Sequence, residues 1–145
     1  MPSVKNSTAL VTGASKGLGL SFAEELARRG SHLVLVARSE QSLQALAQSL
    51  ARRYGVKTFV IAVDLAAPDA VAAILAELER QQLHVDLLVN NAGLGLTGDF
   101  LSHDLGKELG TIQVNVNALV GLSHVLGARM VERGEIGRAS CRERV

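Results

Sequence analysis

The sequence of 145 residues contains one cysteine and few aromatic side chains. With Cys141 as its only cysteine, the chain cannot build an internal disulfide framework, which is typical of a reducing compartment, so we expect a cytoplasmic location. Aromatic residues make up 3% of the chain and tryptophan is absent, so we expect no surface that stacks nucleic-acid bases. The net charge of +1 likewise offers no basic footprint for nucleic acid.

Long apolar runs and metal-binding patterns are also missing. The polar start at residues 1–8 predicts no signal peptide, and no apolar run approaches the roughly 18 residues of a membrane-spanning helix. The four histidines, His32, His84, His103 and His124, are not spaced like metal ligands alongside acidic or cysteine side chains. We therefore expect neither a membrane span nor a metal site.

Apolar runs alternate with amphipathic stretches over most of the chain. Strands are predicted at residues 8–12, 32–37, 57–63 and 85–90. Helices are predicted at residues 15–29, 39–54, 69–82 and 105–132. In the first helix, Leu18, Phe22 and Leu26 are spaced along one face. This alternation predicts one α/β domain at residues 1–134, a Rossmann-type, doubly wound parallel sheet in three αβα layers with strand order 3-2-1-4.

A glycine-rich segment at residues 12–19, TGASKGLG, joins the first predicted strand to the first helix. Gly13 permits a sharp turn with positive φ, Gly17 leaves no side chain between the backbone and a ligand, and Gly19 lets the helix lie close to its strand. The free N–H groups at the start of the helix would then face outward, where a pyrophosphate fits. An ordinary turn that needs glycine for packing is the alternative.

Charged and polar residues follow the other strands, at the edge where parallel sheets bind ligands. Arg38 follows the second strand and, with Lys16, suits the 2′-phosphate of NADP better than the ribose hydroxyl of NAD. Glu40 keeps NAD open, and two solvated surface cations are the alternative. Asp64 is placed to accept a hydrogen bond from an adenine amino group, or simply to lead into the next helix. Asn-Asn-Ala-Gly at residues 90–93 can brace the fourth strand end and line the groove.

Four motifs occur in order: Thr-Gly-x-x-x-Gly-x-Gly at residues 12–19, Asp64-Leu65, Asn-Asn-Ala-Gly at residues 90–93, and Val-Asn-Val-Asn at residues 114–117. Together, at this spacing, they resemble the short-chain dehydrogenase/reductase family over residues 8 to 134. The resemblance implies cofactor-binding roles for Thr12, Gly13, Ser15, Lys16, Gly17, Leu18, Gly19, Arg38, Asp64, Leu65, Asn91, Ala92 and Gly93. It also implies that Asn115 is a catalytic asparagine that holds a water in a proton relay. A core asparagine satisfied by the backbone is the alternative.

The same resemblance implies an activity. The protein would be an NADP-dependent oxidoreductase that moves hydride between nicotinamide and a small-molecule carbonyl or alcohol, with NAD the less favoured cofactor. Residues 94–100 would form one wall of the substrate pocket and favour an apolar substrate. The family commonly pairs its long helices, so a homo-oligomer through residues 105–132 is expected. Two alternatives stay open: a nucleotide-binding module without catalysis, and a Rossmann methyltransferase, in which Asn-Asn-Ala-Gly and Arg38 would have no role.

The family's Tyr-x-x-x-Lys pair has no counterpart in this sequence. The only tyrosine, Tyr54, lies in the second predicted helix and has no lysine four residues further on. The serine and the Tyr-x-x-x-Lys pair of the family follow a fifth strand, which would come after residue 134. Residues 135–145 instead carry three arginines and two glutamates, a composition that predicts no buried strand.

The composition of residues 135–145 has a specific explanation. Apart from its first base, one back-translation of this segment reads as a widely used short-read sequencing adapter. We therefore expect a non-native tail there, and a divergent natural tail is the alternative. On this hypothesis the sheet stops after the fourth βα unit and leaves the fourth strand as an exposed apolar edge. Such a fragment would be aggregation-prone and inactive.

Overall fold

The computed structural model describes residues 4–134 and 139–141 of the chain. The strands are β1 (Thr8–Thr12), β2 (His32–Ala37), β3 (Thr58–Ala62), β4 (Leu87–Asn90) and β5 (Ala139–Cys141). The helices are α1 (Gly17–Arg28), α2 (Glu40–Tyr54), α3 (Ala70–Arg80), α4 (Leu105–Ile112) and α5 (Leu119–Glu132). A 3₁₀ turn, η1 (Phe100–Ser102), precedes α4, and a π-helical stretch, η2 (Gln113–Ala118), joins α4 to α5. Each of the four predicted strands is present in its predicted region.

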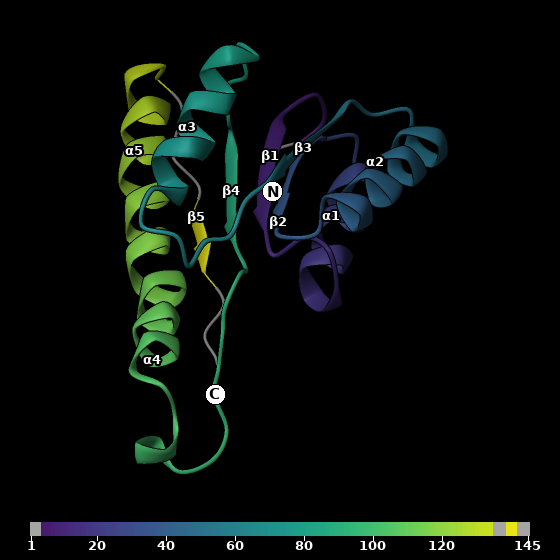
Figure 1. Cartoon of the computed structure of the whole chain (residues 1–145). Helices are drawn as coiled ribbons and strands as arrows, with labels where there is room; N and C mark the ends of the chain where they lie inside the picture. The colour runs from purple at the N-terminus through teal and green to yellow at the C-terminus, as the bar shows by residue number, and fades with distance from the viewer. Residues whose placement is uncertain (1–3, 135–138, 142–145) are drawn as a thin grey trace.

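The strands form one parallel sheet in the order β3-β2-β1-β4-β5. Successive side chains of a strand point to opposite faces, so Leu10 and Val34 pack with α3 and α5, while Val11 and Leu35 pack with α1 and α2. Figure 1 shows these helix pairs on the two sides of the sheet. The predicted Rossmann-type, three-layer αβα fold and the order 3-2-1-4 are therefore confirmed.

The sheet continues one strand beyond the prediction. β5 pairs in parallel with β4, with Leu88 opposite Ala139 and Asn90 opposite Cys141. The expectation that β4 is an exposed edge is therefore wrong. Apolar patterning identifies buried strands, whereas a ladder needs only backbone N–H and C=O groups, and a short edge strand can pair without an apolar sequence. Residues 135–138 and 142–145 lie outside the described residues, and the adapter hypothesis stays a prediction.

Helix α1 packs on a different face from the one expected. Its buried residues are Gly19, Ala23 and Ala27, at intervals of four, whereas Leu18 is 46% exposed and Phe22 40% exposed. The spacing of four residues agrees with the prediction, but the buried positions lie one residue after Leu18, Phe22 and Leu26. Small side chains occupy the buried face because they let the helix backbone approach β1 and β2 closely.

The predicted helix at residues 105–132 is divided by the π-helical stretch. From there on Val114, Ala118, Leu122, Leu126 and Met130 face the core. The opposite face exposes apolar side chains at a similar spacing, and we call it the outer apolar face. It comprises Leu105, Leu109, Ile112, Val116 and Val120, each at least 50% exposed.

The stretch Leu105–Glu132 also meets a length and composition test for a membrane span. It has 28 residues, and within it an 18-residue segment with a mean hydropathy of 1.2 is 22% buried. Such a stretch is weak support for a span, because the core helix of a soluble protein passes the same test. The expectation that the chain has no membrane span is not confirmed.

Candidate dinucleotide site

Backbone hydrogen bonds bring the glycine turn and the strand ends together. The Ala14 N–H donates to the Val36 carbonyl (3.2 Å), which ties the turn to the end of β2 beside Arg38. The Val63 N–H donates to the Ala37 carbonyl (2.9 Å), which ties the segment before Asp64 to the same place. The predicted residues after β1, β2 and β3 therefore meet at one edge of the sheet, as a parallel arrangement requires.

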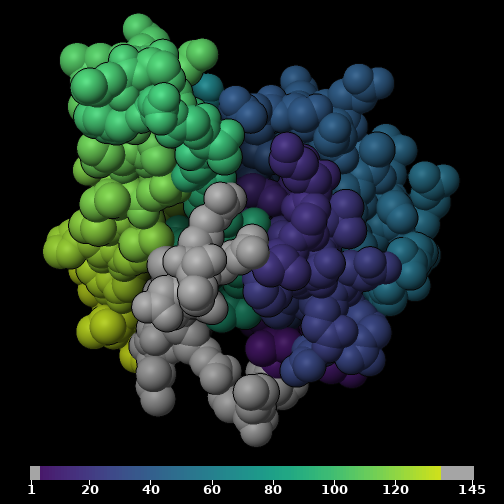
Figure 2. Space-filling view, turned by 90° about the horizontal axis from the view of Figure 1, so that it is seen from below, coloured from purple at the N-terminus to yellow at the C-terminus, as the bar shows by residue number. Residues whose placement is uncertain are grey.

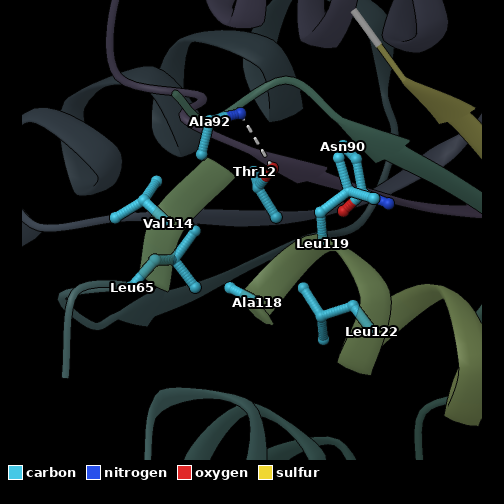
Figure 3. A pocket seen from close by; sticks show the side chains of 8 residues that line it. All are labelled: Thr12, Leu65, Asn90, Ala92, Val114, Ala118, Leu119 and Leu122. Atoms are coloured by element: carbon cyan, nitrogen blue, oxygen red, sulfur yellow. Dashed lines mark hydrogen bonds between the residues drawn. The ribbon is translucent and has the colours of Figure 1, made fainter. Parts of the chain in front are cut away.

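Thr12 joins this edge to the end of β4. Its hydroxyl accepts from the N–H groups of Asn91 and Ala92 (3.0 Å each) and lies 3.4 Å from the Val89 carbonyl, to which it donates. Thr12 is 2% exposed, so its side chain holds two strand ends together rather than facing a ligand. Figure 3 shows its contact with Ala92. The sequence placed Thr12 in the cofactor loop without revealing this structural role.

Asn91 lies under the glycine turn. Its amide donates to the carbonyls of Thr12 (3.1 Å) and Gly13 (3.3 Å). Its side-chain Oδ1 atom is buried and has no hydrogen-bond partner among the described residues. Buried acceptors are normally satisfied, so this oxygen is an exception among the described side chains.

Gly13 and Gly19 have the positive φ and the close contact that the sequence predicted, and the ligand role of Gly17 stays a prediction. Gly13 has φ +66° and Gly17 has φ +57°, both in the left-handed region. A Cβ on Gly17 would meet nothing within 4 Å, so the backbone there is open to an approaching ligand. A Cβ on Gly19 would lie 2.1 Å from the Gly13 carbonyl oxygen and 2.5 Å from Asn91 Nδ2. Gly19 is therefore required by the contact between turn, helix and Asn91.

The start of α1 is arranged for an anion. Lys16 precedes the helix in extended conformation (φ −160°, ψ 169°), and no side chain of the described residues caps the first turn. That turn contains no acidic residue. The N–H groups at a helix start carry partial positive charge, and here they lie beside an exposed lysine. Together with the open space at Gly17, these groups fit a pyrophosphate.

The two predicted cations, Lys16 and Arg38, are exposed. Neither makes an ion pair or side-chain hydrogen bond within the described part of the chain. Ser39, next to Arg38, caps α2 by accepting from the Ser42 N–H (3.3 Å), which fixes the backbone there. Glu40 lies in the first turn of α2 and is also exposed. Both guanidinium and ammonium groups are therefore available at the edge to which the turn and β2 contribute.

The segment after β3 is split between surface and core. Asp64 is exposed, and its Oδ1 accepts from the Ala66 N–H (3.0 Å), a local turn that leads toward α3. Leu65 is 6% exposed and packs in the core, so only its backbone can reach a ligand. The adenine-site roles of these two residues stay predictions.

Asn115 occupies the π-helical stretch and clamps Leu94. Its Oδ1 accepts from the Leu94 N–H and its Nδ2 donates to the Leu94 carbonyl, each at 2.8 Å. The side chain is therefore satisfied by backbone, the alternative considered above. A π turn departs from the i→i−4 ladder and frequently marks a functional site. The water-holding role of Asn115 stays a prediction, and its partner Leu94 had no sequence signal.

A small hollow lies between the strand ends and the π-helical stretch (Figure 3). It is lined by Thr12, Leu65, Asn90, Ala92, Val114, Ala118, Leu119 and Leu122. Asn90 is 6% exposed and donates to the Ser123 hydroxyl (2.9 Å), which ties β4 to α5. Among residues 4–134 and 139–141 no cluster of three His, Cys, Asp or Glu side chains could hold a metal.

Comparisons with known proteins agree with this geometry. The family model for short chain dehydrogenases matches residues 7–139. Very-long-chain 3-oxoacyl-CoA reductase-A of Danio rerio is 38% identical over 131 residues, which cover 88% of this chain and 40% of that protein. The chain therefore belongs to the short-chain dehydrogenase family.

Two solved structures show the same fold. L-sorbose reductase from Gluconobacter frateurii, complexed with NADPH and L-sorbose, is 36% identical with a TM-score of 0.84, covering 91% of this chain and 50% of its own. A short-chain dehydrogenase from Sphingobium yanoikuyae, in complex with NADPH, is 38% identical with a TM-score of 0.82, covering 89% and 50%. The chain thus spans half or less of the length of these relatives.

Proposed function

We propose that the intact protein is an NADP-dependent oxidoreductase acting on a carbonyl or alcohol group. The observation that carries the proposal is the edge assembled from the glycine turn, the uncapped start of α1, and the exposed Lys16 and Arg38. NADPH in the two related structures supports the same cofactor. NAD is the less favoured cofactor, because no acidic residue stands directly after β2.

The residues of this chain would divide the binding work. The N–H groups at the start of α1 would hold the pyrophosphate, and Lys16 with Arg38 would neutralise the 2′-phosphate. Asp64 and Leu65 would flank the adenine, and Asn91, Ala92 and Gly93 the ribose side of the groove. Bound NADPH supplies the hydride for a carbonyl, and NADP accepts one from an alcohol.

Asn115 would act near the reacting end of the cofactor. Its clamp on Leu94 fixes the segment that follows β4. The proton-transfer residues of the family, a serine and a Tyr-x-x-x-Lys pair, would follow β5 in the intact protein. Tyr54 is no substitute, because it lies on α2, where its hydroxyl contacts Glu24 (3.4 Å). We therefore propose that the 145-residue chain by itself binds the nucleotide without turnover.

Titration of the intact protein with NADPH and NADH tests the cofactor assignment. We expect tighter binding of NADPH, and in Arg38→Ala a loss of about tenfold to a hundredfold in NADPH affinity, because a charged hydrogen bond contributes about 1.5–3 kcal/mol. NADH affinity should stay unchanged. Arg52→Ala, an exposed arginine in the last turn of α2, is the matched control. Equal affinity of the unmodified protein for both nucleotides would contradict the proposal.

The outer apolar face supports self-association in the intact protein. Its five exposed apolar residues follow one side of α4, the π-helical stretch and the start of α5. Exposed apolar patches of this kind mark interfaces with protein or membrane. We propose pairing with the same face of a second copy. Sedimentation of Val116→Asp should show a smaller particle than the unmodified protein. If the unmodified protein instead bound lipid bilayers and Val116→Asp did not, the outer apolar face would be a membrane contact.

A further inference from the structure

Hydrogen bonds of His103 close the segment between β4 and α4. His103 Nδ1 lies 2.6 Å from Glu108 Oε1, and its Nε2 lies 3.1 Å from the Thr97 carbonyl oxygen. The side chains of His103 and Glu108 are 16% and 22% exposed. This cluster joins a residue before η1, a residue after it and the first turn of α4. We call it the His103 clasp.

The partners of His103 define its protonation state. A carboxylate and a carbonyl oxygen can only accept hydrogen bonds, so both ring nitrogens must donate, and only the imidazolium has two N–H groups. His32 provides the contrast, because its Nδ1 faces the Lys57 N–H (3.1 Å) and must accept. The closed clasp, with both contacts made, therefore requires His103 to be protonated.

The surroundings of His103 agree with this geometry. The Glu108 carboxylate, and after it the Thr97 carbonyl, raise the pKa of His103 above its ordinary value of 6.5, against smaller opposing effects of burial and of Lys107. A raised pKa means that the clasp stabilises the fold fully below the ordinary value. That contribution is lost as the pH rises through the folded-state pKa.

The clasp determines the course of the loop that it spans. Gly98 has φ +114°, and a Cβ there would lie 3.5 Å from His103 Nε2, so the Thr97 carbonyl is aimed at the ring by a conformation that favours glycine. Between the two ends of the clasp, Phe100 is 68% exposed and Leu101 92% exposed. The start of the loop is already held by Asn115 at Leu94. Two side-chain clamps thus position residues 94–104 at the carboxyl end of β4.

We propose that protonated His103 is a positioning residue that holds residues 94–104 as the apolar wall on the substrate side of the dinucleotide site. The wall rests on the proposed function, since it requires a nicotinamide site at this edge. Below the pKa of His103 the clasp is closed, and Phe100 and Leu101 are held as part of the wall. Above that pKa one ring nitrogen loses its proton, one of the two bonds breaks, and the wall loosens.

The clasp itself is tested in the intact protein without any substrate. Imidazole NMR should show His103 titrating above its ordinary pKa, and Glu108→Gln should lower that pKa. Hydrogen exchange of residues 97–103, corrected for intrinsic rates, should speed up as the pH passes the pKa. In His103→Gln it should be fast at every pH, and His84→Gln, an exposed histidine elsewhere, should match the unmodified protein. Unaltered protection in His103→Gln, or an unshifted pKa, would overturn the clasp.

The wall is tested by NADPH oxidation with a series of aliphatic methyl ketones as probe substrates. We expect KM for the best ketone to rise through the pKa of His103 while kcat holds, and His103→Gln to have the high KM at every pH. A flat KM profile with a titrating loop would overturn the wall and leave the clasp standing. Failure to oxidise NADPH with any ketone would contradict the proposed function, and the exchange data would still decide the clasp.

Discussion

The chain up to β3 and the chain beyond β4 are held together in different ways. In the first part, strand pairing and backbone bonds such as Ala14 to Val36 fix the glycine turn against the sheet. In the second part, which we call the helical arm (residues 93–132), the loop is fixed by two side chains, Asn115 and His103. Figure 2 shows α1 and α2 on one side of the molecule and α4 and α5 on the other.

The difference separates a binding half that is held mainly by backbone pairing from an arm whose loop is held by side chains. Backbone contacts form with many different side chains, so the geometry of the candidate dinucleotide site depends on few side chains apart from Thr12 and Asn91. α4 has no buried residue, and its placement therefore relies on a few polar contacts and on what covers the outer apolar face. Substitutions should act by steric clash in the binding half and by loss of a clamp in the arm.

The largest effect is expected where the binding half has no space. In Gly19→Ala the new Cβ would lie 2.1 Å from a backbone oxygen, and neither the turn nor α1 can move without breaking their contacts. We expect a loss of at least about 3 kcal/mol in the free energy of unfolding, together with loss of NADPH binding. Chemical denaturation and nucleotide fluorescence measure the two effects.

Gly127→Ala is the matched control in the arm. A Cβ there meets nothing within 4 Å, and alanine favours the helical conformation of α5, so we expect a gain of about 0.5–1 kcal/mol. If both variants were equally stable, close packing at Gly19 would not be what holds the turn.

An intermediate effect is expected from the clamp at Leu94. Asn115→Ala removes two hydrogen bonds and leaves the Leu94 backbone groups unpaired, which should cost about 2 kcal/mol of unfolding free energy. Hydrogen exchange should become faster in residues 94–104 and stay unchanged in β1 and β2. Asn117→Ala, an exposed residue two positions on, should change stability by less than about 0.5 kcal/mol. Loosening of β1 as well would show that arm and binding half are not independent.

The smallest effect is expected in the pH dependence of stability, which differs between the two parts. Hydrogen bonds from Arg28, and then from Arg29, lower the pKa of Glu25 on α1 to about 2. A lowered pKa stabilises the fold above the ordinary value of 4.5, and this contribution is lost as the pH falls toward 2. The cluster is exposed, so the change in Tm should be small.

The pH dependences of stability have opposite signs in the two parts, because acid weakens the Glu25 cluster whereas rising pH weakens the His103 clasp. Carboxylate NMR of Arg28→Gln should show the Glu25 pKa returning toward 4.5, whereas Arg52→Gln should leave it low. An unchanged Glu25 pKa in Arg28→Gln would refute the assignment.

Most of the fold could be predicted because apolar period and glycine position act locally. α2 lies within one residue of the predicted helix at 39–54, bounded by the Ser39 cap and by Gly55 at φ +69°. The phase of α1 could not be predicted, because the helix buries Ala23 and Ala27 for close approach while Phe22 stays half exposed. β5 escaped prediction because backbone pairing leaves no apolar signature.

The sequence proposed which residues form the candidate site, and it could not predict the contacts that they make. The motifs located the glycine turn, Arg38 and Asn115 because each follows a strand end or belongs to a spaced pattern. That Thr12 is a buried hub, and that Asn115 is fully occupied by Leu94, depend on contacts across 79 and 21 residues, which no local pattern encodes. The His103 clasp was missed because an isolated histidine and a glutamate five residues apart carry no motif.

The π-helical stretch has a consequence for how this chain tolerates changes in length. A π turn holds about one residue more than an α turn, so deleting one residue between Gln113 and Ala118 would let the stretch relax to α-helix while α4 and α5 stay nearly in phase. Leu105 and Leu109 would keep the stripe that they share with Val120. A deletion inside α4 or α5 has no such reserve, and it would rotate the two ends of the arm against each other by about 100°.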